Sequence, residues 1–232
     1  MRKLLIFTIC IGLVMGLAGC GCGSKDDATL PDNERLAITV DGNEVFLDEA
    51  KYYAYSSQAT YEVYFISEGK EIDWNAKVEG TTWQGMVKGQ TLDDICRREC
   101  FYAKKDDYNV KLETEEKEEV ERKVKNYFAE SSDKLKKKIG ITKKRLMEVF
   151  TKDAVATKVQ DIMEAEEKGS AGKYYKDFID DASVNCEKCW SDINFQEHIF
   201  NLKEVEEGTG LATKVPEETE EDTPLESAEY GT

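Results

Sequence analysis

The sequence of 232 residues contains a single histidine, His198, and only three prolines. Zinc sites built from several histidines are therefore excluded, and a Ser-His-Asp triad would depend on His198 alone. Basic residues are also scarce, with 32 Lys and Arg against 48 Asp and Glu, which gives a net charge of −16. Because nucleic-acid binding needs a basic surface that neutralises phosphates, we expect no nucleic-acid partner.

A long apolar run is found only at the start of the chain. Arg2 and Lys3 precede the uncharged residues 4–18, which are too few to span a bilayer comfortably and predict a signal peptide over residues 1–19. The run ends in Leu-Ala-Gly-Cys at Cys20, which resembles the lipobox of bacterial lipoproteins. This resemblance implies that Cys20 is acylated and anchors the protein to the extracytoplasmic face of the bacterial cell membrane. An uncleaved anchor helix is the alternative.

Composition divides the rest of the chain into three parts. Residues 20–35 are small and polar and predict a flexible tether. Residues 36–202 carry the apolar patterning of a folded domain, which begins with two β-prone runs around the hairpin signal Asp41-Gly42. Residues 203–232 contain two lysines against ten acids and predict a disordered acidic tail.

The domain is predicted to be mainly α. Apolar residues at helical spacing indicate long helices over residues 47–66, 82–108, 114–130 and 143–166, with short helices near 133–139 and 174–179. Ser132 or Asp133, Thr142 and Gly140 are typical helix caps. Residues 68–80 break the pattern around Trp74 and predict an irregular or partly ordered loop, and residues 184–198 predict a short strand and a last helix.

The hairpin over residues 38–45, followed by Leu47-Asp48-Glu49-Ala50, resembles the opening of SurA/PrsA-type extracytoplasmic foldases. Residues 89–95 and 140–150 are similar to the helices that complete the N-terminal domain of that family, so the resemblance covers about residues 36–200. It implies a SurA-N-like helical bundle that binds unfolded or secreted polypeptides without ATP. Isomerases of the family insert a parvulin domain, for which residues 158–190 are too few. We therefore expect no enzyme activity.

The helix predicted over residues 47–66 is unusually rich in aromatic residues. Rings give a large contact area at a low cost in conformational entropy, so such a helix suits a surface that binds many clients, although core packing explains most rings on an amphipathic face. A lipoprotein that displays a surface or recognises a solute or protein, without chaperone activity, is the alternative function, and an isomerase that has lost its inserted domain is a third. The predicted client-binding residues are Tyr52, Tyr55, Tyr61, Tyr64 and Phe65.

Seven cysteines are the least explained feature of the sequence. Cys10 leaves with the signal peptide, Cys20 is the lipid site, and Cys22 has no evident role. Disulfides are favoured outside the cytoplasm, a four-cysteine zinc or iron–sulfur site is the second interpretation, and thiol redox chemistry the third. The first two require the two remaining pairs to lie close together. These pairs are Cys96 with Cys100, one helical turn apart, and Cys186 with Cys189.

Overall fold

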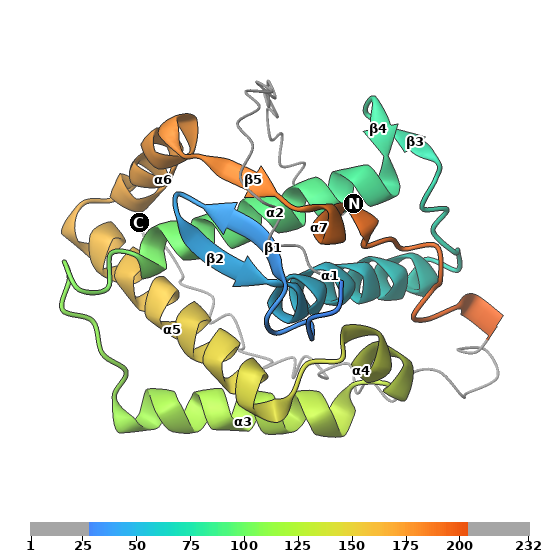
Figure 1. Cartoon of the computed structure of the whole chain (residues 1–232), viewed down its shortest axis with the longest axis horizontal. Helices are drawn as coiled ribbons and strands as arrows, with labels where there is room; N and C mark the ends of the chain where they lie inside the picture. The colour runs from blue at the N-terminus through green and yellow to red at the C-terminus, as the bar shows by residue number, and fades with distance from the viewer. Residues whose placement is uncertain (1–27, 204–232) are drawn as a thin grey trace, which may run out of the picture.

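A computed structural model describes residues 28–203 of the chain (Figure 1). Within this range the protein has seven helices and a small antiparallel sheet near the N-terminus, which confirms the predicted mainly α class. The predicted signal peptide, the lipidation site Cys20, Cys22, the first half of the tether and the acidic tail beyond residue 203 lie outside the described residues. None of the described helices is long and apolar enough to cross a membrane.

Both ends of the described chain meet in one three-stranded sheet. Strands β1 (Leu36–Val40) and β2 (Asn43–Phe46) form the predicted hairpin. Its turn residues Asp41 and Gly42 have φ values of 47° and 85°, the left-handed conformations that a two-residue hairpin turn requires. Strand β5 (Val184–Cys186) pairs antiparallel with the other edge of β1, so the order is β2-β1-β5.

Three long helices build the body of the protein. α1 (Leu47–Ser67) follows β2 directly, and α2 (Trp83–Tyr102) packs against both α1 and α5 (Lys143–Glu166). α5 runs diagonally in Figure 1 from α2 to α3 (Thr114–Glu130), which forms the lower edge of that view.

The shorter helices close the remaining faces. α4 (Asp133–Ile139) packs against α1, and α6 (Ser170–Asp181) packs against α2 and α5. α7 (Lys188–Asp192) contacts β1 and α1. The side chains of these elements share one continuous apolar core with the sheet and the three long helices.

Local capping signals set several of the helix boundaries. The hydroxyls of Ser132 and Thr142 accept hydrogen bonds from backbone N–H groups in the first turns of α4 and α5, and Gly140 ends α4 with a φ of 71°. The predicted helix over 82–108 is too long, because α2 ends at Tyr102. Residues 103–109 instead form turns, in which four consecutive charged residues at 104–107 leave Tyr108 as the one large apolar side chain packed against the core.

The loop around Trp74 is more ordered than predicted. Residues 68–82 contain a small hairpin of β3 (Lys77–Val78) and β4 (Thr81–Thr82). Trp74 is only 2% exposed, and its Nε1 donates a hydrogen bond to Glu62 Oε1 at 3.2 Å. Its ring lies 4.8 Å from that of Phe195, centroid to centroid. The contact with Phe195, which lies more than 100 residues later in the chain, therefore fixes this loop.

The buried carboxylate of Glu62 also holds the segment that follows α7. Oε2 of Glu62 accepts hydrogen bonds from the backbone N–H groups of Ile199 and Phe200, both at 2.8 Å. His198 Nδ1 lies 3.2 Å from Glu62 Oε1. The last helix predicted within residues 184–198 is limited to the five residues of α7. The residues after α7 form an irregular segment that hydrogen bonds attach to Glu62 of α1.

The domain begins earlier than the sequence predicts. Residues 31–35 were expected within the tether, yet the carbonyls of Asp32 and Arg35 accept hydrogen bonds from the backbone N–H groups of Asp48 and Leu47 at the start of α1. Lys51 also forms an ion pair with Asp32. The end of the predicted tether is thus part of the fold.

Candidate functional site between helices α1 and α2

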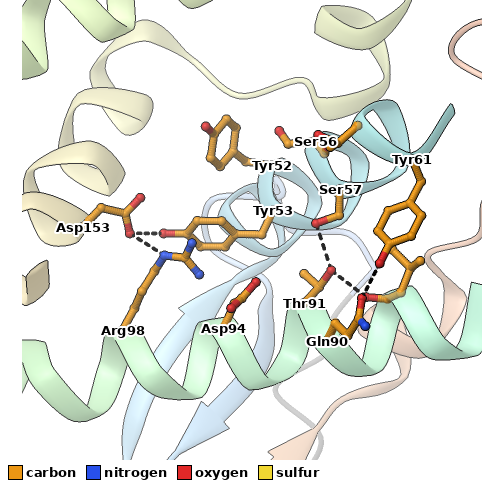
Figure 2. A pocket seen from close by; sticks show the side chains of 12 residues that line it. Tyr52, Tyr53, Ser56, Ser57, Tyr61, Gln90, Thr91, Asp94, Arg98 and Asp153 are labelled. Carbon is orange, nitrogen blue, oxygen red and sulfur yellow. Dashed lines mark hydrogen bonds and ion pairs between the residues drawn. The ribbon is translucent and has the colours of Figure 1, made fainter. Parts of the chain in front are cut away.

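A cavity of about 280 Å³ opens between α1 and α2, with α5 contributing at one end (Figure 2). Its lining is unusual for a helical bundle because hydroxyl, amide and charged groups alternate with tyrosine rings. Neither histidine nor cysteine occurs among its described lining residues. The lining side chains offer hydrogen bonds and ring surfaces to a ligand. They are Tyr52, Tyr53, Ser56, Ser57, Thr60 and Tyr61 of α1, Val87, Gln90, Thr91, Asp94 and Arg98 of α2, and Asp153 of α5.

One end of the cavity is a fixed ionic group. Oδ1 of Asp153 accepts hydrogen bonds from Arg98 Nε at 2.9 Å and from the Tyr53 hydroxyl at 2.8 Å. The Arg98 guanidinium also lies over the Tyr53 ring at 4.3 Å. Burial raises the pKa of Asp153, and the charge of Arg98 and these hydrogen bonds only partly oppose that effect. The three side chains, drawn together in Figure 2, tie α1, α2 and α5 to one another.

At the opposite end of the cavity, hydrogen bonds between uncharged side chains join α1 to α2. The Tyr61 hydroxyl lies 2.7 Å from Gln90 Oε1, and the hydroxyls of Ser57 and Thr91 are 3.1 Å apart (Figure 2). Thr91 also donates to the carbonyl of Val87 at 2.8 Å. These pairs hold the two helices in register and leave Ser56 and Thr60 on the α1 side of the cavity.

Asp94 is the charged residue of the cavity that the network does not engage. Within residues 28–203 its carboxylate forms no hydrogen bond or ion pair with another residue. Desolvation raises its pKa, and the nearby charge of Arg98 opposes this effect without cancelling it. In Figure 2 Asp94 stands on the α2 side of the cavity, between Arg98 and Thr91.

A patch of rings adjoins the Tyr61 end of the cavity, and we call it the aromatic patch: Tyr61, Tyr64, Phe65 and Trp83. Trp83 is 5.2 Å from Phe65 and 6.2 Å from Tyr61 between ring centroids, and Tyr64 is 5.7 Å from Phe65. Tyr64 is 56% exposed, which makes it one of two large apolar side chains exposed in the described residues; the other is Leu30. Tyr61 belongs to both the patch and the cavity.

The predicted client-binding residues separate in the structure. Tyr52 and Tyr61 line the cavity, and Tyr64 and Phe65 lie in the aromatic patch. Tyr55 is different, because it is only 8% exposed, packs against Phe195 and lies beneath the ammonium group of Lys138. In this structure the ring of Tyr55 therefore belongs to the core.

Sequence reasoning missed the α2 and α5 sides of the site. Gln90, Asp94 and Arg98 are spaced four residues apart and therefore share one face of α2. This polar stripe was the available signal, but a stripe of that kind normally faces solvent. Asp153 carries no comparable signal, since it is one acid among many on α5.

A buried ionic cluster lies next to the end of the cavity that Arg98 and Asp153 form. Lys152 Nζ contacts Glu49 Oε1 at 2.8 Å and Glu99 Oε1 at 2.5 Å, although the two glutamates are 4% and 3% exposed. Arg145 Nε lies 3.0 Å from Asp48 Oδ2 at the start of α1. The cluster again joins α1, α2 and α5, so the arrangement of the three helices around the cavity depends on paired charges.

The cysteines do not form the predicted cross-links. No disulfide joins any two cysteines of residues 28–203, and no three His, Cys, Asp or Glu side chains in that range are arranged to hold a metal. Cys189 Sγ lies 3.1 Å from the carbonyl of Leu36, and Cys100 is buried on α2 close to Tyr174. Across the two pairs, the thiols of Cys96 and Cys186 lie near enough to interact electrostatically.

The chain was also compared with known proteins. No protein-family model, curated protein or solved structure matches it.

Proposed function

We propose that this protein is a membrane-anchored, extracytoplasmic lipoprotein that binds unfolded or secreted polypeptides in a chaperone-like manner, without ATP and without prolyl isomerase activity. The observation that carries the proposal is the joining of the cavity to the aromatic patch through Tyr61. Together they form one continuous surface along α1 and α2 that offers both partly exposed rings and polar groups.

The chemistry of this surface suits an extended polypeptide of variable sequence. Hydroxyl and amide groups such as those of Ser56, Thr60 and Gln90 pair with a peptide backbone whatever its side chains are. The rings of Tyr64 and Trp83 supply apolar contact area at a low cost in rotamer entropy. Neither feature selects a single sequence, as expected of a protein that binds many clients.

The order of the elements supports the proposed relation to the SurA/PrsA-type N-terminal domain. A hairpin leads directly into a long helix, a second long helix packs against it, and a short helix precedes another long one. The chain then returns to pair β5 with the hairpin. The membrane anchor is proposed from the lipobox at Cys20 alone.

The test is suppression of aggregation of a reduced model client, followed by light scattering. We expect the purified protein to slow aggregation and the Tyr64→Ser variant to bind the client about fivefold more weakly, because removal of a ring from a contact patch typically costs about 1 kcal/mol or more. Leu30→Ser is the matched control, since Leu30 is the other exposed large apolar residue and does not line the cavity or the patch.

Two results would argue against this function. If the folded protein, verified by circular dichroism, leaves aggregation unchanged, a display or recognition lipoprotein becomes the better assignment. Acceleration of prolyl isomerisation in a proline tetrapeptide would contradict the proposed lack of isomerase activity.

A further inference from the structure

The unengaged carboxylate of Asp94 identifies the chemistry of the ligand side chain that the cavity accepts. Two guanidinium groups lie near it, and both have other partners. Arg98 is bonded to Asp153 at 2.9 Å, and Arg97 lies over the ring of Tyr175 at 4.0 Å. Asp94 is thus an exposed acid at the cavity that forms no hydrogen bond or ion pair with a cation among residues 28–203, although Arg98 and Arg97 act on it electrostatically.

The local charge balance favours a cation at this position. Of the three charged side chains that line the cavity, Asp94 and Asp153 are acids and Arg98 is a base, so the lining carries one net negative charge. Asp93 and Arg97, both near Asp94 on α2, add one charge of each sign and leave this balance unchanged. The whole chain has a net charge of −16, so long-range attraction acts in the same direction.

The rings beside Asp94 suit the stem of a long basic side chain. Lys and Arg bury their methylene stems along apolar surfaces and place the charged group at a polar site or over an aromatic face. Tyr52 and Tyr61 line the same cavity as Asp94, and the aromatic patch continues from Tyr61. A cation at Asp94 and an apolar residue on the patch would therefore occupy one continuous surface.

We propose that the cavity selects polypeptide segments in which a lysine or arginine neighbours aromatic or aliphatic residues, with the basic group paired to Asp94 and the apolar residues on the aromatic patch. This inference rests on the proposed function and specifies its class of client. Asp94 would select clients by the charge of their side chain. The aromatic patch would supply the apolar contacts that all clients share.

The test uses two fluorescent peptides that are identical except for one central position, which is lysine in one and methionine in the other. Affinities are measured by fluorescence anisotropy at physiological ionic strength. We expect the wild-type protein to bind the lysine peptide about tenfold more tightly, the effect of one charge-assisted hydrogen bond. In Asp94→Asn this preference should fall to about onefold, while the affinity for the methionine peptide is unchanged.

Asp93→Asn is the matched control, because it removes the same charge from the neighbouring position of α2. The Asp93 side chain is directed to the Tyr175 hydroxyl, at 2.6 Å from Oδ1, and does not line the cavity. This control should keep the lysine preference. Equal loss of preference in both variants would overturn the inference, since overall acidity would then explain it.

The remaining outcomes separate the inference from the proposed function. If wild-type protein binds both peptides equally, the selection by Asp94 is wrong and polypeptide binding stands. If neither peptide binds to the folded protein, the proposed function itself is overturned, and the inference falls with it.

Discussion

Replacement of Lys152 by methionine should be one of the most destabilising single substitutions in this protein. The change keeps most of the side-chain volume and removes the charge that neutralises the buried carboxylates of Glu49 and Glu99. Removal of one partner from a buried ion pair typically costs about 3–5 kcal/mol, because the remaining charge is left uncompensated. With a urea m-value of about 2 kcal/mol/M, the unfolding midpoint should fall by about 1.5–2.5 M.

The pH dependence of this loss tests its electrostatic origin. Burial raises the pKa of Glu99, and the charge of Lys152 opposes that effect. In Lys152→Met the folded-state pKa of Glu99 therefore rises further above its unfolded value. An acid whose pKa is raised on folding destabilises the protein fully above its folded pKa, and this penalty falls with pH until it vanishes below the unfolded pKa. The loss of unfolding free energy in Lys152→Met, relative to wild type, should accordingly become smaller as the pH is lowered from 7.5 to 5.

Urea unfolding followed by far-UV circular dichroism measures both effects. Lys152→Arg should retain most of the stability, and Glu99→Gln in the Lys152→Met background should recover part of it, because one uncompensated charge is removed. Lys123→Met, which breaks the exposed pair with Glu119 at 3.9 Å, should cost less than about 1 kcal/mol. A deficit for Lys152→Met below about 1 kcal/mol, or one that does not change with pH, would refute the reasoning.

Three further predictions concern other parts of the molecule. Trp83 is half-buried whereas Trp74 and Trp190 are buried, so Trp83→Phe should remove most of the acrylamide quenching of tryptophan fluorescence; strong residual quenching would contradict the burial of the other two. Gly140→Ala should lower the free energy of unfolding by about 1 kcal/mol in urea titrations, because φ there is 71°. Desolvation raises the pKa of the Cys186 thiol to about 11, so its alkylation by iodoacetamide, followed by mass spectrometry, should accelerate about tenfold per pH unit between pH 7 and 10, and a plateau near pH 8 would contradict this.

The features predicted correctly from the sequence are those with local causes. Asp41-Gly42 supplies the left-handed turn of the hairpin, and Ser132, Thr142 and Gly140 form caps whose partners lie within four residues. Trp74 was misjudged because its order depends on Glu62 and Phe195, which only the folded chain brings near. No local pattern around residue 74 contains that information.

The candidate site likewise contains residues that a local sequence pattern reveals and residues that only the folded chain brings together. Tyr52 and Tyr61 were identified because aromatic residues are conspicuous on one helix. Asp94 and Arg98 were not, because the sequence does not reveal that their face of α2 lies opposite α1 rather than in solvent. The ionic cluster around Lys152 was missed for a related reason, since charged residues are seldom buried and the pattern of one helix does not show which partners another provides.

The sheet ties the completion of folding to the completion of the chain. The Cys189 thiol and the Leu36 carbonyl that it contacts are 153 residues apart, and β1 keeps one edge unpaired until β5 joins it. A polypeptide made or exported from its N-terminus cannot fill that edge until almost the whole domain has emerged. Such long-range pairing slows folding, so the exposed edge of β1 is open to other strands during this interval. A protein proposed to bind unfolded chains would thus itself be vulnerable to them until its last strand arrives.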